Sequence, residues 1–140
     1  SMVADADSQL DTVAEHDEAG HITNHKKPDD PRVTRIGRFI RATSIDELPQ
    51  LFNVLQGNMT LVGPRPELTR LVSEYAPWQH KRFAMTQGIT GWWQVNGRSD
   101  RPCHLSTDKD MTYIQHYSFL LDIQILLMTI PAVLNGKGAY

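Results

Sequence analysis

The spacing of hydrophobic and polar residues predicts several helices, beginning near the N-terminus. Apolar residues recur every three or four positions over residues 2–16, as on one face of an amphipathic helix. The polar composition of the stretch that follows, His21 to Pro31, is typical of a loop. Further helices are expected over residues 33–41, from Ser44 to a stop at Gly57, and from Leu68 to a break at Pro77.

The segment from residue 87 to residue 98 has a different composition. It reads QGITGWWQVNGR, and its three glycines are unfavourable in a regular helix. We expect a loop with one short strand, in which Trp92 and Trp93 face opposite ways on an extended backbone. The chain is therefore predicted to be a small, mostly α single domain with short irregular or β segments.

The most hydrophobic segment lies between Asp110 and Leu134, where polar residues form only a narrow helical stripe. A transmembrane helix needs about 20 predominantly apolar residues. Asp122 lies within this segment, and an aspartate near the bilayer centre costs at least roughly 2.5 kcal/mol. Pro131 also interrupts the pattern. We therefore expect a buried helix or an amphipathic helix at a membrane interface.

Composition and charge exclude several classes of protein. The 140 residues carry a formal net charge of −2, which argues against a general nucleic-acid-binding protein, because phosphate backbones require a basic surface. Cys103 is the only cysteine, so neither an intrachain disulfide nor a four-cysteine zinc site can form. The first 20 residues are acidic and lack the apolar region of a signal peptide.

Two adjacent carboxylates and two arginines are the strongest candidates for a reactive site. Asp46 and Glu47 stand at the start of a predicted helix. Arg41 lies five residues before Asp46, and Arg65 is held between two prolines. Guanidinium groups bind phosphate oxygens through paired hydrogen bonds. A carboxylate beside them stays ionised and can bind a divalent metal or attack phosphorus, which indicates phosphoryl transfer.

The same residues also have a purely structural interpretation. Glu47 can complete a capping box with Ser44, and a carboxylate at Asp46 interacts favourably with the helix dipole. Arg65 could pair with a surface carboxylate. The residue types alone leave both interpretations open.

Longer stretches of the sequence resemble a known family. The segment from Arg32 to Pro66, which contains RIGRFIRATSIDELPQLFNVLQGNMTLVGPRP, is similar to the bacterial sugar transferases. These are polyprenyl-phosphate phosphoglycosyl transferases of monotopic type. The resemblance continues through GITGWWQVNGR at residues 88–98, LDIQIL at residues 121–126 and the closing GKGAY. It covers nearly all of the chain from Pro28 onward.

The resemblance implies a reaction and roles for individual residues. Enzymes of this family transfer a sugar-1-phosphate from a UDP-sugar to undecaprenyl or another polyprenyl phosphate, which initiates exopolysaccharide, capsule or O-antigen assembly. Asp46 would be the nucleophile that forms a covalent aspartyl-phosphosugar intermediate, and it would also hold Mg²⁺. Glu47 would act as a base or orient the acceptor. Arg41 and Arg65 would bind substrate phosphates, and Asp122 would bind substrate or make a structural hydrogen bond.

The resemblance also implies a cellular location. Residues 1–140 would form the catalytic domain of a monotopic protein at the cytoplasmic face of the bacterial inner membrane, with a membrane anchor preceding this chain. Arg35, Arg38 and Arg41 recur every three residues and could contact anionic lipid head groups, although for Arg35 a solvated basic face is an equal alternative. The sugar, the oligomeric state and the activity of this part alone are left open.

Two other functions fit parts of the sequence. A non-catalytic module could dock on a membrane partner through the apolar segment from Leu120 to Leu134. A metal-dependent, phosphatase-like hydrolase could use Asp46 with water as the acceptor. A dry, lipid-facing acceptor site would argue against the hydrolase.

Overall fold

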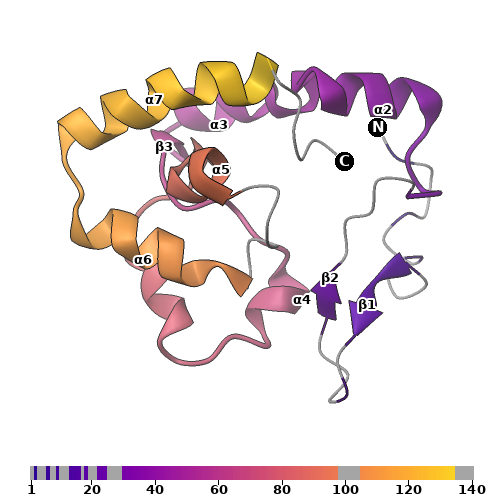
Figure 1. Cartoon of the computed structure of the whole chain (residues 1–140), viewed down its shortest axis with the longest axis horizontal. Coiled ribbons are helices and arrows are strands. Elements are labelled where there is room, and N and C mark those ends of the chain that lie inside the picture. The colour runs from indigo at the N-terminus through magenta and orange to yellow at the C-terminus, as the bar shows by residue number, and fades with distance from the viewer. Residues whose placement is uncertain are drawn as a thin grey trace.

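Helices make up most of the structure, a computed structural model shown in Figure 1. It describes residues 30–97 and 105–134, together with residues 2, 6, 9, 13–16, 18 and 22–24. The elements in chain order are β1 Glu15–His16, β2 Ile22–Asn24, α2 Arg35–Ala42, η1 Ile45–Glu47, α3 Gln50–Leu55, β3 Thr60–Val62, α4 Thr69–Val72, η2 Gln79–Ala84, β4 Gly88–Thr90, α5 Trp92–Gly97, α6 Thr107–Gln115 and α7 Phe119–Leu134, where η denotes a 3-10 helix. The predicted class, a small and mostly helical fold, is confirmed.

The N-terminal part differs from its prediction. Strands β1 and β2 pair in an antiparallel sheet, and Met2 makes an isolated bridge with Val33. The helix expected over residues 2–16 is therefore wrong at its C-terminal end, and the loop expected from His21 contains a strand. Most of the remaining residues of both segments lie outside the described ones. The spacing of apolar residues indicates only a local preference for helix. Hydrogen-bonded pairing with another strand can override that preference.

Helix α2 confirms the helix expected over residues 33–41. Its first turn is capped by Thr34, whose hydroxyl accepts a hydrogen bond from the backbone N–H of Gly37 at 2.9 Å. The predicted apolar side of this helix is not covered. Ile36 and Phe39 are 73% and 65% exposed.

A sharp turn follows α2 at Ser44, which adopts the left-handed conformation with φ = 56°. Such a conformation is unfavourable for a residue other than glycine. The single helix expected from Ser44 is divided into η1 and α3, and Gly57, with φ = 79°, ends it as predicted. Ser44 makes no side-chain capping bond. The predicted capping box is therefore wrong, because the Glu47 carboxylate is turned toward Arg65.

Strands β3 and β4 form a two-stranded parallel sheet at the centre, with Thr60 opposite Gly88 and Val62 opposite Thr90. A side chain at Gly91 would overlap with the carbonyl group of Gly63, so this close backbone approach requires glycine. The sheet packs against α7, and the central hydrophobic core consists of Val62, Tyr113 and Ile125 with partly buried neighbours that include Trp92, Val95 and Leu121.

The segment that contains the two tryptophans is partly different from its prediction. The short strand is present as β4, but Trp92–Gly97 forms helix α5 instead of an extended loop. Trp93 is 3% exposed, and Trp92 packs against the core, so packing accounts for both side chains. A helix forms here because α5 packs against α6 and α7, which outweighs the local preference of the glycine-containing segment.

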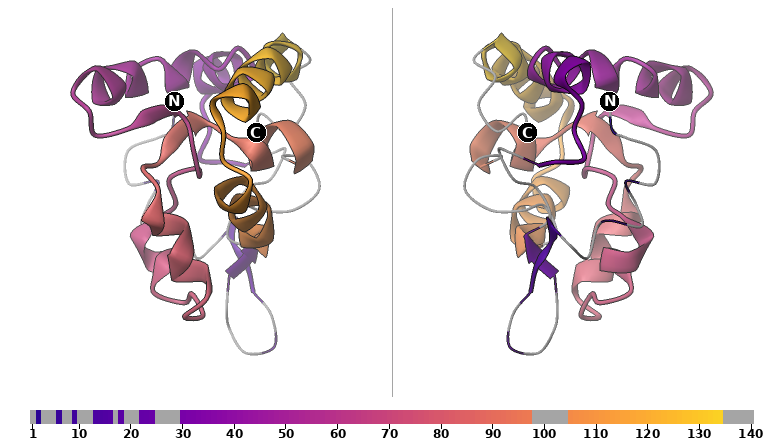
Figure 2. Two further views of the ribbon diagram at one scale, coloured as in Figure 1. Left: turned by 90° about the vertical axis from the view of Figure 1, so that its left-hand side faces the viewer. Right: turned by 90° about the vertical axis from the view of Figure 1, so that its right-hand side faces the viewer.

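The apolar C-terminal segment forms two helices, α6 and α7, instead of one, and residues 116–118 between them are not helical. The Ser118 hydroxyl accepts a hydrogen bond from the backbone N–H of Leu121 at 3.2 Å, at the start of α7. Among the described residues, no helix combines the length and the hydrophobicity needed to cross a membrane. Figures 1 and 2 show α2, α3 and α7 together along one side of the molecule, with α4, η2 and α6 toward the other.

Candidate active site

The two adjacent carboxylates lie on η1, the short turn between α2 and α3. Backbone hydrogen bonds of 3.1 Å from Glu47 to Ser44 and from Leu48 to Ile45 hold this turn. Asp46 is exposed, whereas the side chain of Glu47 is only 17% exposed. The turn therefore presents Asp46 to solvent and directs Glu47 toward the protein.

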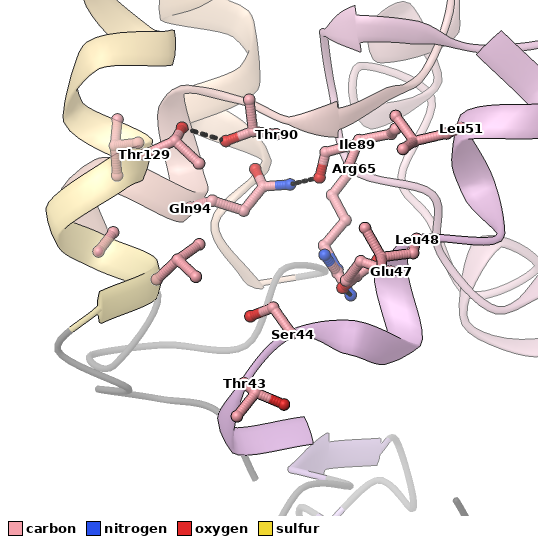
Figure 3. Close-up of a pocket in the computed structure, with 13 residues that line it drawn as sticks. Thr43, Ser44, Glu47, Leu48, Leu51, Arg65, Ile89, Thr90, Gln94 and Thr129 are labelled. Carbon is pink, nitrogen blue, oxygen red and sulfur yellow. Dashed lines mark hydrogen bonds and ion pairs between the residues drawn. The ribbon is translucent and has the colours of Figure 1, made fainter. Parts of the chain in front are cut away.

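Glu47 forms an ion pair with Arg65, as Figure 3 shows. The distance from Arg65 Nη2 to Glu47 Oε1 is 2.8 Å, and the other carboxylate oxygen accepts a hydrogen bond from Gln50 Nε2. Arg65 follows β3 and stands between Pro64 and Pro66, which restrict the backbone on both sides. The structure thus brings together Arg65 and the dyad, which are distant in the sequence.

A buried arginine holds the backbone of the Pro-Arg-Pro segment. Arg82 Nη2 donates to the carbonyl oxygen of Arg65 at 2.6 Å and forms an ion pair with Asp110 at 2.6 Å, while Nη1 donates to the Tyr75 hydroxyl at 2.7 Å. Burial raises the pKa of Asp110 to about 6, although the charge and hydrogen bond of Arg82 act in the opposite direction. Sequence analysis did not identify Arg82 or Asp110, because neither stands in a motif with the dyad.

A cavity of about 280 Å³ opens beside the Glu47–Arg65 pair (Figure 3). It lies between the α2–α3 region and the last turns of α7, and β4 and α5 contribute to its wall. Six of the thirteen lining residues are apolar, and the polar ones include Gln94, Thr90 and Thr129. The lining residues are Thr43, Ser44, Glu47, Leu48, Leu51, Arg65, Ile89, Thr90, Gln94, Val95, Thr129, Ala132 and Val133.

Three predicted site residues lie outside this lining. Asp46 is on the same turn as Glu47 but points to solvent. Arg41 is half-buried in the last turn of α2. Its charge helps to lower the pKa of Asp30, after the larger effect of the Arg32 hydrogen bonds. Asp122, in the first turn of α7, accepts a hydrogen bond from the Tyr113 hydroxyl at 2.6 Å.

The dyad is compatible with the Mg²⁺ that the family resemblance implies. Within the described parts of the chain, no group of three or more His, Cys, Asp or Glu side chains could hold a metal ion. Mg²⁺ is commonly held by one or two carboxylates, with water and substrate phosphate as the other ligands. An exposed carboxylate at Asp46 is suited to that mode of binding.

Comparisons with known proteins identify the family. The chain belongs to the bacterial sugar transferases, whose family pattern matches residues 1–136. It is 43% identical to the galactosyl transferase CpsE of Streptococcus agalactiae over 99% of this chain and 31% of that protein. It is also 43% identical to a UDP-galactose-lipid carrier transferase of Erwinia amylovora, over 100% of this chain and 30% of the relative. An undecaprenyl-phosphate galactose phosphotransferase of Salmonella typhimurium is 45% identical over 82% of this chain and 24% of its own length. The chain spans less than a third of each of these relatives.

Proposed function

We propose that this chain is the catalytic part of a phosphoglycosyl transferase, which moves a sugar-1-phosphate from a UDP-sugar to undecaprenyl phosphate. The names of the relatives support the donor and the acceptor. The observation that carries the proposal is the 2.8 Å ion pair between the Arg65 guanidinium and Glu47. Glu47 is the sequence neighbour of the exposed Asp46. A guanidinium group near an exposed carboxylate is an arrangement suited to phosphoryl transfer.

In the first step, an Asp46 carboxylate oxygen attacks the phosphorus atom that carries the sugar. The new bond joins this oxygen to phosphorus, and the bond from phosphorus to the UMP oxygen breaks, which releases UMP with the bonding electrons. Arg65 moves from Glu47 to the pyrophosphate oxygens and neutralises part of their charge. Bound Mg²⁺ would further neutralise the pyrophosphate and leaving group, with Asp46 as its protein ligand.

In the second step, a phosphate oxygen of the polyprenyl phosphate attacks the same phosphorus atom. The bond from phosphorus to Asp46 breaks, which regenerates the carboxylate and yields the polyprenyl diphosphate sugar. Glu47, next in the chain, orients the acceptor phosphate or accepts its proton. Arg41, in the last turn of the preceding helix, and Asp122 are proposed to assist in substrate binding.

An apolar face supports docking on the cytoplasmic leaflet of the inner membrane, where the lipid acceptor would be found. Helices α2, α3 and α7, which lie along one side in Figures 1 and 2, carry many exposed apolar side chains. We define the apolar face by Ile36, Phe39, Leu51, Phe52, Leu55, Phe119, Leu120, Ile123, Leu127 and Ile130, all of which are at least 40% exposed. Exposed apolar patches of this kind mark membrane or protein interaction sites. The exposed Arg35 and Arg38 can contact anionic head groups.

The test uses the full-length enzyme in membranes and a UDP-sugar labelled in the phosphate that carries the sugar. Label should become bound to the wild-type protein, and Asp46→Asn should abolish both this label and UMP release, by a factor of about 10⁴ or more in rate. Asp108→Asn, at an exposed position on α6, serves as the control and should react like the wild type. Wild-type turnover by an Asp46 variant would refute the covalent mechanism.

The exposed apolar surface of α7 also suits a non-catalytic module that docks on a membrane partner. The labelling experiment distinguishes the two functions. Membrane binding without UMP release from any UDP-sugar would favour the docking module. Release of free sugar phosphate into water would instead favour a hydrolase that uses Asp46.

A further inference from the structure

The Glu47 carboxylate is held by two groups of different character. Arg65 Nη2 lies 2.8 Å from Glu47 Oε1, and Gln50 Nε2 donates a hydrogen bond to Glu47 Oε2. Exchange of the amide oxygen and nitrogen of Gln50 would set an oxygen against the carboxylate, so the nitrogen is the donor. One carboxylate oxygen is therefore held by a charged group and the other by a neutral one.

Gln50 contacts Glu47 from the protein side and not from the cavity. Glu47 and Arg65 line the cavity, and Gln50 is not among the lining residues. Gln50 is half-buried at the first position of α3, where the backbone N–H of Leu51 donates to the carbonyl oxygen of Leu48 at 3.0 Å. A substrate in the cavity would therefore meet Glu47 and Arg65, and Gln50 would act on it only through Glu47.

The two groups that hold Glu47 respond differently to a substrate phosphate. Phosphate oxygens attract the Arg65 guanidinium and compete for it with the Glu47 carboxylate. The Gln50 amide carries no net charge and lies outside the cavity lining, so a phosphate there does not compete for it. When Arg65 turns to the phosphate, the hydrogen bond from Gln50 remains to fix the orientation of the Glu47 carboxylate.

The Gln50 amide adds little net stability to the fold. Its hydrogen bond to a carboxylate is favourable, but its Oε1 atom is buried and, within the described part of the chain, has no hydrogen-bond partner. A hydrogen bond to a charged group and a buried acceptor without a partner have opposite effects of similar size on the free energy of unfolding. The amide is therefore better suited to orient Glu47 than to stabilise the protein.

We infer that Gln50 is a positioning residue for sugar-phosphate transfer, which holds the Glu47 carboxylate in place after Arg65 has moved to the substrate phosphate. This inference rests on the proposed function, because it assumes that a phosphate draws Arg65 away from Glu47. With its orientation kept, Glu47 can orient or deprotonate the acceptor phosphate in the second step. Without Gln50 the carboxylate would rotate about its side-chain bonds, and the reactive geometry would form less often.

The first test uses initial rates of UMP release by the full-length enzyme in membranes, at varied concentrations of UDP-sugar and polyprenyl phosphate. Gln50→Met keeps the length of the side chain and removes the amide. It should lower kcat/KM for polyprenyl phosphate roughly tenfold and leave kcat/KM for the UDP-sugar within about twofold, because only the second step uses Glu47. Gln56→Met, at the exposed C-terminal end of α3, is the matched control and should change neither value. An equal loss in both values, or in neither, would overturn the inference.

The second test asks whether Gln50 acts through Glu47. Gln50→Met, introduced into Glu47→Ala, should cause less than about a twofold further loss in kcat/KM for polyprenyl phosphate, because the carboxylate that it positions is already absent. A further loss of about tenfold would show that the two residues act independently and would overturn the inference.

A second variant serves if Gln50→Met does not fold. Gln50→Glu has nearly the same shape and replaces the donating N–H groups with an oxygen. It should lower kcat/KM for polyprenyl phosphate at least as much as Gln50→Met, because two carboxylates repel each other. A wild-type value in a folded Gln50→Glu variant would count against the inference.

Crystal structures of variants of the 140-residue chain test the contact independently of activity. In Arg65→Met, which imitates the departure of the guanidinium, Glu47 should keep its side-chain conformation and its hydrogen bond from Gln50. In Arg65→Met combined with Gln50→Met, the Glu47 side chain should leave that conformation. A Glu47 side chain already displaced in Arg65→Met alone would overturn the inference. Structures as expected, together with a full-length enzyme that releases no UMP from any UDP-sugar, would refute the proposed function alone.

Discussion

Two of the arginine–carboxylate pairs among the described residues have similar distances but differ in burial. Arg82 and Asp110 are 2.6 Å apart, with side chains 0% and 2% exposed. Arg65 and Glu47 are 2.8 Å apart, and their side chains are 21% and 17% exposed. Breaking a buried pair leaves an uncompensated charge in a medium of low polarity, whereas a pair near water is worth only about 0–1 kcal/mol. The first pair therefore fixes structure, and the second can open for a substrate.

The two pairs meet at one residue. The backbone carbonyl of Arg65 accepts a 2.6 Å hydrogen bond from the buried Arg82, while the Arg65 guanidinium reaches Glu47 near the surface. Arg65 is thus rigid at its backbone and able to change partners at its head group. This division is suited to a side chain that must bind phosphate and release it in each cycle.

The largest effect on stability is expected from breaking the buried pair. Arg82→Met should lower the free energy of unfolding by about 3–5 kcal/mol at neutral pH, because Asp110 then remains buried without its partner. Urea denaturation followed by circular dichroism measures this change. Lys81→Met, at the exposed neighbouring position, should stay within about 0.5 kcal/mol of the wild type. An equally small effect at Arg82 would mean that the buried pair does not anchor the fold.

The same pair should make stability depend on pH. The pKa of Asp110 is about 6 in the folded protein and 3.8 in the unfolded chain. Between these pH values the folded state holds a proton on Asp110 that the unfolded state has released. The contribution of this proton to the free energy of unfolding is therefore present below pH 3.8 and is lost as pH rises through 6. Its size is at most about 3 kcal/mol.

Unfolding experiments at several pH values from acid to neutral, on the wild type and Asp110→Asn, isolate this contribution. The difference in unfolding free energy between the two proteins should decrease as pH rises through the window. Asp108→Asn, an exposed neighbour on the same helix, should follow the wild type. A wild-type curve parallel to that of Asp110→Asn would contradict the raised pKa.

An intermediate effect is expected at Tyr113, which is 1% exposed and donates to the half-buried Asp122. Burial, together with this hydrogen bond, raises the pKa of Tyr113, so the hydroxyl stays protonated. Tyr113→Phe should cost about 1.5 kcal/mol of unfolding free energy. Tyr117→Phe, at a 56% exposed ring, is the control. If Tyr113→Phe lowers transfer activity without a loss of stability, Asp122 acts in substrate binding more than in structure.

The smallest effect on stability is expected at the pair near the surface. Glu47→Gln should change the unfolding free energy by less than about 1 kcal/mol. Its transfer rate should nevertheless fall by a factor of about 10² or more, because the group beside the nucleophile is lost. UMP release from the full-length enzyme measures the rate, and Glu74→Gln, at an exposed position, is the control. A large loss of stability with normal turnover would reverse the roles assigned to the two pairs.

Local features of the fold were predictable because they depend on neighbouring residues. The helix over residues 33–41 follows from its apolar spacing, and Gly57 ends the next helical segment because glycine readily adopts φ = 79°. The predictions failed where a distant partner decided the conformation. Residues Glu15–His16 pair with β2, and α5 packs against α7, although neither local pattern indicated these structures.

The sequence by itself determined the helical class, the Asp46–Glu47 dyad and its resemblance to the bacterial sugar transferases, since these depend on residue types and short spacings. Only the tertiary structure decided which groups meet. It joined Arg65 to Glu47 across 18 positions and Thr90 to Thr129 across 39. It also buried the Arg82–Asp110 pair. Such contacts arise from packing between elements distant in the chain, and a periodic pattern of hydrophobic residues carries no information about them.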